Sequence, residues 1–375
     1  MMTDEQMTTD FEPEVPKPPR VALIASRRTL AEYPSYLKHL LVGLADEAVP
    51  VVLICPPGSD ADSIIPPAVE VVRHPAIDIS LMQHYNLHVL LNRVGKFEPD
   101  IIHCLCETSA ATARWLARNL DIPYLLNINS ISSHWSVISF SPVRCANIVV
   151  PAKTIADHFV ATHPKFADRV RQINVGTFVE DSTACFMHPE HLPGIVVAPP
   201  LDNYANLDNL FQALHRLIVD GCQFIVALIA SRRPEGPLWK QIRSLDLLHA
   251  VTIVPRSLGL YSAGSAADVF IAPRPSGRFN MLLLTAMSAG SVVAASKGGI
   301  DDLIIEDKTA FIFNPDDQLS VYNCLKRIFD RPDEARRLAE SAQQYLRQNH
   351  NVSGMVSTAI SLYRQAVCSK TRANA

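Results

Sequence analysis

Arginine residues stand directly after several apolar segments of the sequence, where they are well placed to bind an anion. The set comprises Arg27, Arg28, Arg232, Arg233, Arg256, Arg274 and Arg278. A guanidinium group binds phosphate through paired hydrogen bonds, which a lysine ammonium group cannot form. If the apolar segments are parallel strands, their ends share one sheet edge, where unpaired helix amides also favour anions. We therefore predict an anionic ligand. The alternative is that each arginine lies in solvent or pairs with a nearby acid such as Glu235 or Asp302.

A second candidate cluster, His103, Cys104, Cys106 and Glu107, lies at the end of another apolar segment. Cys104 and Cys106 share one face, because side chains alternate along a strand. Metal ligation would need a further ligand from elsewhere and two adjacent residues on opposing faces, so core packing is the favoured interpretation. The eight cysteines are scattered through apolar stretches without a CxxC pattern. This distribution predicts buried reduced thiols rather than a disulfide framework or a zinc site.

Polar residues that could face a ligand follow two other segments. Asn129 and His134 belong to a polar loop, in which His134 is a candidate for contact with a polar acceptor and a plain turn is the favoured interpretation. Gly298 and Gly299 could expose amides to a phosphate or a sugar hydroxyl at the start of a helix, or form a tight strand-to-helix turn. The sequence contains neither a Gly-x-Ser-x-Gly nucleophile motif nor a phosphate loop of the Gly-Lys-Ser/Thr type.

The hydrophobic pattern predicts a scaffold for these candidates in which strands alternate with helices. Short apolar runs bounded by polar residues are typical of buried parallel strands. Strands are predicted at 20–25, 51–55, 100–104, 124–128, 146–150, 194–198, 223–229, 251–254, 268–272 and 292–295. Helices are predicted at 36–46, 84–94, 110–119, 207–219, 238–246, 281–289, 319–329, 332–347 and 353–367. The alternation predicts an α/β protein with two doubly wound, Rossmann-like domains that face a cleft.

Length and composition agree with two domains. The chain has 375 residues, and a typical domain has about 150. We predict a disordered tail at 1–19, an N-terminal domain at 20–180, a linker at 181–193, a C-terminal domain at 194–350 and a terminal helical segment at 351–375. A net charge of −3 does not favour a nucleic-acid partner. The sequence shows no signal peptide and no transmembrane run, so we expect a soluble, cytoplasmic protein.

The order of several motifs resembles that of a known family. In the second half these are Ala267–Ser276, Phe279, Ala286-Met287, Gly298-Gly299 and Asn314-Pro-Asp-Asp317, and in the first half Pro99–His103, Ile122-Pro123 and Val175-Gly176. Over residues 20–367 the chain resembles the GT-B glycosyltransferases of family 4, also called group 1. The resemblance implies a nucleotide-sugar donor as co-substrate, no metal or other cofactor, and retaining transfer to an acceptor. It also implies that the terminal helix crosses back to the first domain.

The chain departs from the family pattern at the positions that carry charge. In this alignment the replacements are Pro200 for an arginine, Ala205 for a lysine and Asn206 for the glycine after it, Gly277 and Thr285 for two glutamates, Asn129 for a histidine near the reaction centre, and Arg27-Arg28 for a glycine pair. These departures predict an eroded catalytic set, and we assign no catalytic residue.

The predicted ligand contacts follow from the arginines, the glycines and the resemblance. On the donor side they are Arg256, Arg274, Ser276, Arg278, Asn280, Gly298 and Gly299, and on the acceptor side Arg27, Arg28, Asn129 and His134. The first hypothesis is a glycosyltransferase-like protein that binds a nucleotide sugar in the interdomain cleft and, if active, transfers the sugar with retention to an unknown acceptor. The second is an inactive pseudo-glycosyltransferase that serves as a binding or scaffolding module for a protein partner. A hydrolase or epimerase on the same architecture has no motif in its support.

Overall fold

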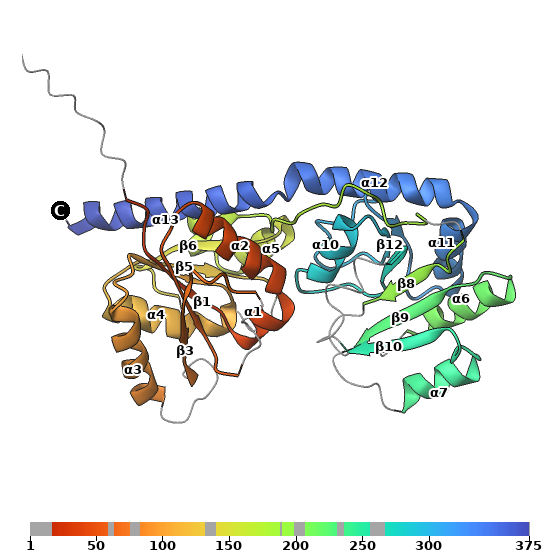
Figure 1. The fold of residues 1–375 in the computed structure, drawn as a ribbon, viewed down its shortest axis with the longest axis horizontal. Coiled ribbons are helices and arrows are strands. Elements are labelled where there is room, and N and C mark those ends of the chain that lie inside the picture. Colours follow the sequence, from red (N-terminus) through yellow and green to blue (C-terminus); the bar gives the residue numbers. More distant parts are fainter. Residues whose placement is uncertain are drawn as a thin grey trace, which may run out of the picture.

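The computed structural model describes residues 17–58, 64–75, 83–131, 140–187, 190–198, 207–230, 236–255 and 267–374. Most of the tail predicted at 1–19 lies outside these ranges. Two lobes, each built on one sheet, lie side by side, and a pair of long helices runs along one edge of both (Figure 1). The predicted α/β architecture of two Rossmann-like domains is confirmed.

The first domain is built on a seven-stranded parallel sheet. In spatial order its strands are β3 (Glu70–Arg73), β2 (Val51–Cys55), β1 (Val21–Ile24), β4 (Ile101–Cys104), β5 (Tyr124–Asn127), β6 (Cys145–Val150) and β7 (Val170–Gln172). Its helices are α1 (Arg27–Glu32), α2 (Pro34–Asp46), α3 (Gln83–Gly95), α4 (Ala110–Asn119) and α5 (Lys153–Thr162). Strands β1, β2, β4 and β5 are buried along their whole length, because helices cover both faces of the sheet.

The second domain is built on a six-stranded parallel sheet. In spatial order its strands are β10 (Val251–Pro255), β9 (Ile225–Ala230), β8 (Gly194–Val197), β11 (Val269–Ala272), β12 (Val292–Ala295) and β13 (Phe311–Ile312). Its helices are α6 (Asp208–Val219), α7 (Pro237–Ser244), α10 (Met281–Ser288), α11 (Gln318–Asp330) and α12 (Pro332–Asn349). In both sheets the strand order reverses beside the first strand, between β1 and β4 and between β8 and β11. A ligand crevice is expected at these two switch points.

Helix α13 (Val352–Asn374) leaves the second domain and lies across the first (Figure 1). It packs on α2, and a methyl carbon of Val356 comes so close to Gly43 that a Cβ there would stand 2.4 Å away. A buried polar chain also joins α13 to the sheet: His103 lies 2.6 Å from the hydroxyl of Tyr363 and 2.7 Å from the amide oxygen of Asn127. These contacts connect the end of the chain to its first domain.

The observed elements differ from the predicted ones mainly where an element is short or polar. The sequence pattern missed α1, α5 and the edge strands β3, β7 and β13, which are two to four residues long. Short edge strands carry too few apolar residues to produce a periodic signal. Helix α1 has only six residues and is held by a capping box between Ser26 and Thr29.

Candidate functional site

The switch point of the first domain presents Arg27, Arg28 and Glu32 on α1. Ser26 ends the turn after β1 and caps this helix, so both arginines are its first residues rather than loop residues. Arg27 is exposed, and its guanidinium donates to the carbonyl oxygen of Pro57 at 3.3 Å. Arg28 is half-buried, with Nε 3.8 Å from a carboxylate oxygen of Glu32 one turn later. Sequence reasoning missed Glu32, although the spacing of four residues from Arg28 suits a pair on one helix face.

The loop after β11 holds the donor-side candidates of the second domain. The side chain of Arg274 is 19% exposed and donates to Oδ1 of Asp316 at 2.7 Å. Ser276 folds the loop locally: its hydroxyl donates to the carbonyl of Arg278 and accepts from the Arg278 amide. Asn280 caps α10 by accepting from the amides of the second and third helical residues. Asn280 therefore has a structural role, whereas Arg274 presents charge at the strand end.

Gly298 and Gly299 follow β12, the neighbour of β11 in the sheet. Bends and turns come after them instead of the expected helix, and their amides donate to the carboxylate of Asp301 at 2.8 and 3.3 Å. Gly298 has φ +117°, and a Cβ on Gly299 would lie 2.4 Å from the carbonyl oxygen of Ser276. Both positions require glycine, and their amides already hold an anionic group.

The two switch points meet across the domain boundary. Nη1 of Arg278 lies 3.2 and 3.3 Å from the two carboxylate oxygens of Glu32. The backbone around Arg278 forms an antiparallel bridge with Ser130. In this bridge the Ile131 amide donates to the Gly277 carbonyl at 2.7 Å, and the Phe279 amide donates to the Asn129 carbonyl at 3.0 Å. The loop after β11 is thus bound to the loop after β5.

Two further residues that the site predictions did not include lie beside this contact. Ser130 donates to Glu107 at 2.8 Å, which places a carboxylate at the end of β4. The hydroxyl of Tyr33 donates to the carbonyl of Phe279 at 3.4 Å. Burial raises the pKa of Tyr33 well above its usual value, and the carboxylates of Glu32 and Glu107 raise it further, so the hydroxyl keeps its proton. The site therefore combines arginines from both domains with acidic groups of the first.

Some predicted residues lie outside the described ranges. They are Arg256 on the donor side, His134 on the acceptor side, the additional arginines Arg232 and Arg233, the acid Glu235, and the replacement positions Pro200, Ala205 and Asn206. The acid Asp302 is described, but it does not pair with any of the described arginines of the set. Its carboxylate accepts from the amides of Lys153 and Thr154 at the start of α5.

His103 and the neighbouring cysteines lie in the core. Burial lowers the pKa of His103 to about 4, so the imidazole is neutral and its two nitrogens bond to Asn127 and Tyr363. Among the described residues no group of three or more His, Cys, Asp and Glu is arranged to hold a metal ion. All eight cysteines are free, and six are buried, but Cys222 is half-buried and Cys368 is exposed. For these two residues the prediction of buried thiols was wrong.

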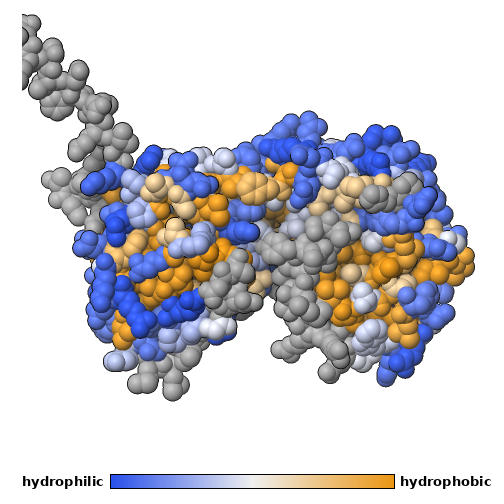
Figure 2. Space-filling model, in the orientation of Figure 1, coloured by the Kyte–Doolittle hydropathy of each residue, from blue (hydrophilic) through white to orange (hydrophobic). Residues whose placement is uncertain are grey.

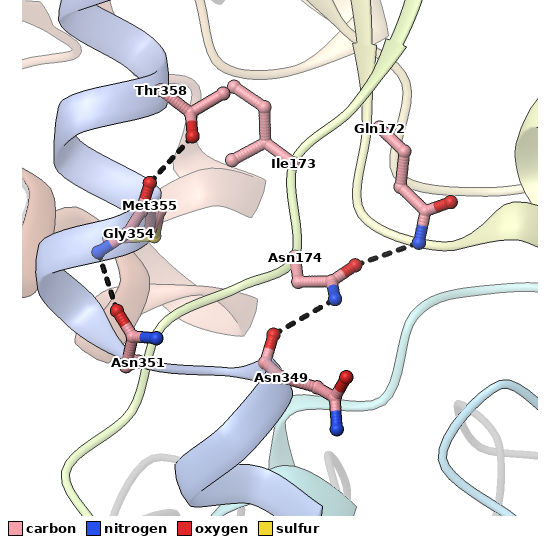
Figure 3. Close-up of a pocket in the computed structure, with 8 residues that line it drawn as sticks. All are labelled: Gln172, Ile173, Asn174, Asn349, Asn351, Gly354, Met355 and Thr358. Carbon is pink, nitrogen blue, oxygen red and sulfur yellow. Dashed lines mark hydrogen bonds between the residues drawn. The ribbon is translucent and has the colours of Figure 1, made fainter.

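Two of the cavities in the described part of the chain lie where the two domains meet. One, of about 400 Å³, is lined by Gln172, Ile173, Asn174, Asn349, Asn351, Gly354, Met355 and Thr358 (Figure 3). Its polar side chains bond to one another and to backbone, for example Asn174 to the carbonyl of Asn349 at 2.9 Å. A smaller cavity of about 240 Å³ lies between α2 and α10 and includes Thr285. Neither of these two cavities is lined by a predicted ligand contact, since Thr285 is only one of the replacement positions. On the face shown in Figure 2, both lobes carry patches of hydrophobic side chains.

Two facing Rossmann-like domains, with charged loops at both switch points and a terminal helix that returns to the first domain, define a GT-B protein. Residues 33–177 match a family model described as glycosyl transferase 4-like domain, and residues 193–331 match one described as glycosyl transferases group 1. The chain belongs to this glycosyltransferase family, as its motifs predicted.

Solved structures and a curated relative agree with this assignment. A glycosyltransferase from Rickettsia africae ESF-5 has a TM-score of 0.77 at 14% identity and covers 94% of this chain and 99% of its own. HepE of Anabaena, solved with UDP and glucose, has a TM-score of 0.73 at 14% identity and covers 92% and 100%. These likenesses show the fold. The sulfoquinovosyl transferase of Arabidopsis thaliana is 25% identical over 268 residues, which are 64% of this chain and 51% of the relative. The chain thus spans about half the length of the curated relative it matches.

In the described part of the chain no helix is both long and apolar enough to span a bilayer. The expected cytoplasmic location, the absence of a nucleic-acid partner and the absence of a metal cofactor stay predictions.

Proposed function

We propose that the chain binds a nucleotide sugar in the cleft between its domains, with the donor diphosphate on Arg274 and the amides of Gly298 and Gly299. The observation that carries this proposal is the bond from both glycine amides to the carboxylate of Asp301. Backbone amides that hold a carboxylate are suited to a phosphate, which offers more charge and more acceptor oxygens. The neighbouring strand end adds the guanidinium of Arg274, whose partner Asp316 is 75% exposed and easily released to water.

The relatives support a UDP-linked sugar as the first donor to test. HepE was solved with UDP-glucose as well as with UDP and glucose. The Arabidopsis relative is named as a sulfoquinovosyl transferase.

If the protein is active, the resemblance implies transfer with retention of configuration. The bond between the anomeric carbon and the diphosphate oxygen breaks with its electron pair on that oxygen, the acceptor oxygen bonds to the anomeric carbon, and the proton of the acceptor hydroxyl passes to the departing diphosphate oxygen. Arg274 and the two glycine amides would stabilise the negative charge that develops on the departing diphosphate. Stabilisation of developing charge is usually the largest single contribution to such a reaction. In this account these protein groups supply the positive charge, without a metal cofactor.

A second candidate function is that of an inactive binding module with a protein partner. Two observations favour it. Thr285 stands where the family pattern has a glutamate, and its hydroxyl bonds to the carbonyl of Met281 in its own helix. Gly277 stands at the other glutamate position, and its carbonyl accepts from Ile131 of the first domain. Neither position offers a carboxylate to a donor sugar.

Thermal unfolding against UDP, UDP-glucose and other nucleotide sugars tests the binding proposal. A ligand at about 100 times its Kd raises the free energy of unfolding by about 2.7 kcal/mol, which shifts the unfolding midpoint clearly. We expect such a shift with one nucleotide class, and its loss in Arg274→Ala. Arg118→Ala, at the end of α4 in the first domain, is the control and should keep the shift. No shift with any nucleotide would contradict the proposal. A shift without release of UDP from any donor and acceptor would favour the inactive module.

A further inference from the structure

Arg278 belongs to the donor-side loop, but its side chain is bound by the other domain. Its Nη1 contacts both carboxylate oxygens of Glu32, and the two side chains are 31% and 18% exposed. Arg28 approaches the same carboxylate at 3.8 Å. Glu32 therefore has two cations, and Arg28 remains beside it if Arg278 turns away.

The same loop lies against the glycine amides of the proposed donor site. The Ile300 amide donates to the carbonyl of Ser276 at 2.8 Å, and Ser276 in turn bonds to the backbone of Arg278. Ser276 thus contacts both the backbone of Arg278 and the turn at Gly298–Gly299. An arginine side chain is long and flexible. A diphosphate on the amides of Gly298 and Gly299 would therefore compete with Glu32 for the guanidinium of Arg278.

From this geometry we infer that the ion pair of Glu32 and Arg278 holds the two domains together, and we call this pair the latch. We also infer that an anion bound to the amides of Gly298 and Gly299 replaces Glu32 as the partner of Arg278, and we call this exchange the takeover. In the ligand-free protein Glu32 acts as a positioning residue, because it holds the donor-side loop against the first domain. It also competes with the ligand for the same guanidinium. The inference rests on the proposed function for the place of the anion, but the ligand-free half of the latch is independent of it.

The latch is well placed to decide whether both substrates can enter. The bridge from Gly277 and Phe279 to Asn129 and Ile131 joins the loops that follow β11 and β5. The ion pair and the hydrogen bond from Tyr33 to the Phe279 carbonyl lie on the same loop contact. A ligand that draws Arg278 away removes the charged part of this contact and leaves only hydrogen bonds.

The affinity for inorganic pyrophosphate, measured by calorimetry, tests the takeover. Glu32→Gln removes the competing charge, and we expect it to tighten pyrophosphate binding about fivefold or more, as is typical of coupled sites. Arg278→Ala should weaken binding, and adding Glu32→Gln to Arg278→Ala should then have no further effect. Glu47→Gln, at the exposed far end of α2, makes the same change in net charge and should leave the affinity unchanged. An unchanged or weaker affinity in Glu32→Gln would overturn the takeover, as would an equal effect in the Arg278→Ala background.

Hydrogen exchange without ligand tests the latch itself. The amides of Ile131 and Phe279, which cross between the domains, should exchange faster in Glu32→Gln and in Arg278→Ala than in the unaltered protein. Equal exchange in all three proteins would overturn the latch. If the unaltered protein binds neither pyrophosphate nor UDP, the proposed function fails together with the takeover, whereas the exchange result still decides whether the ion pair holds the loops.

Discussion

At the scale of single residues, three groups are well suited to bind a phosphate. Each of them is bonded to a carboxylate of the chain itself. Arg274 is bound by Asp316, Arg278 by Glu32, and the amides of Gly298 and Gly299 by Asp301. These partners are half-buried or exposed, and the two ion pairs among these contacts contribute only about 0–1 kcal/mol each to stability. A diphosphate forms stronger charge-assisted hydrogen bonds and can replace them. We therefore interpret these pairs as a ligand-free arrangement of an anion site.

The loop around Gly299 leaves no room for a side chain at this position. A Cβ would lie 2.4 Å from the carbonyl oxygen and 2.7 Å from the amide nitrogen of Ser276, and these backbone atoms cannot move without shifting the loop. We expect Gly299→Ala to lower the free energy of unfolding by about 1–3 kcal/mol, as overpacking does in cores. Urea unfolding measures the effect. Gly95→Ala, whose Cβ would meet only Leu120 at 3.8 Å, should be neutral or stabilising, and an equal loss in both variants would contradict the packing argument.

At the scale of elements, α5 illustrates how the second domain completes a helix of the first. Its N-cap residue is Ala152, which has no side-chain acceptor for the first amides. Asp302 supplies that acceptor from the other domain, at 2.5 Å from the Lys153 amide and 3.3 Å from the Thr154 amide. The negative carboxylate is also favourable beside the positive end of the helix dipole. The cap is therefore an interdomain contact as well as a local one.

Asp302→Ala tests this cap. We expect it to lower the free energy of unfolding by about 1 kcal/mol, because two helix amides lose their acceptor. Asp302→Asn keeps an oxygen acceptor of similar length and should retain most of that stability. Thermal and urea unfolding of the two variants give the comparison. If both variants lose the same free energy of unfolding, the stabilisation comes from the negative charge and not from the hydrogen bonds of the cap. If neither variant loses stability, the contact contributes nothing to the free energy of unfolding.

The elements show what the sequence could and could not predict. Most helices of ten or more residues and the fully buried strands were predicted to within a few residues, because each carries its own periodic pattern. The exceptions are α5, which was missed, and α13, which extends seven residues beyond its predicted end. Helix α1 was missed because it depends on a local capping box formed by Ser26 and Thr29. The turn after Gly298 was expected to start a helix, but the carboxylate of Asp301 binds its amides and the chain turns there instead. At the site, the arginines could be found from sequence, but not Glu32 as the partner of Arg278. That contact joins residues 246 positions apart.

At the scale of the whole molecule, one hydrophobic cluster spans both domains, and a second cluster lies within the second domain. A cluster that begins at β1 and β4 continues through Phe279 and Met281 to α10 and the end of α12. Helix α13 ties this core to the first domain, and neutral His103 fixes its place through Tyr363. The domains are thus joined by packing on one side and by polar contacts at the cleft on the other. The polar contacts are the part that a charged ligand can change.

If a nucleotide sugar replaces carboxylates of the chain between the domains, the variant Asp301→Asn should bind UDP-glucose with a changed affinity. Calorimetry would compare the unaltered protein, this variant, and Asp307→Asn as a control with the same charge change in the same domain. We expect Asp301→Asn to bind UDP-glucose several-fold more tightly, because the carboxylate on the glycine amides no longer competes with the diphosphate, while Asp307→Asn binds as the unaltered protein does. An affinity of Asp301→Asn that equals or falls below that of both other proteins would contradict the replacement of Asp301 by the nucleotide sugar.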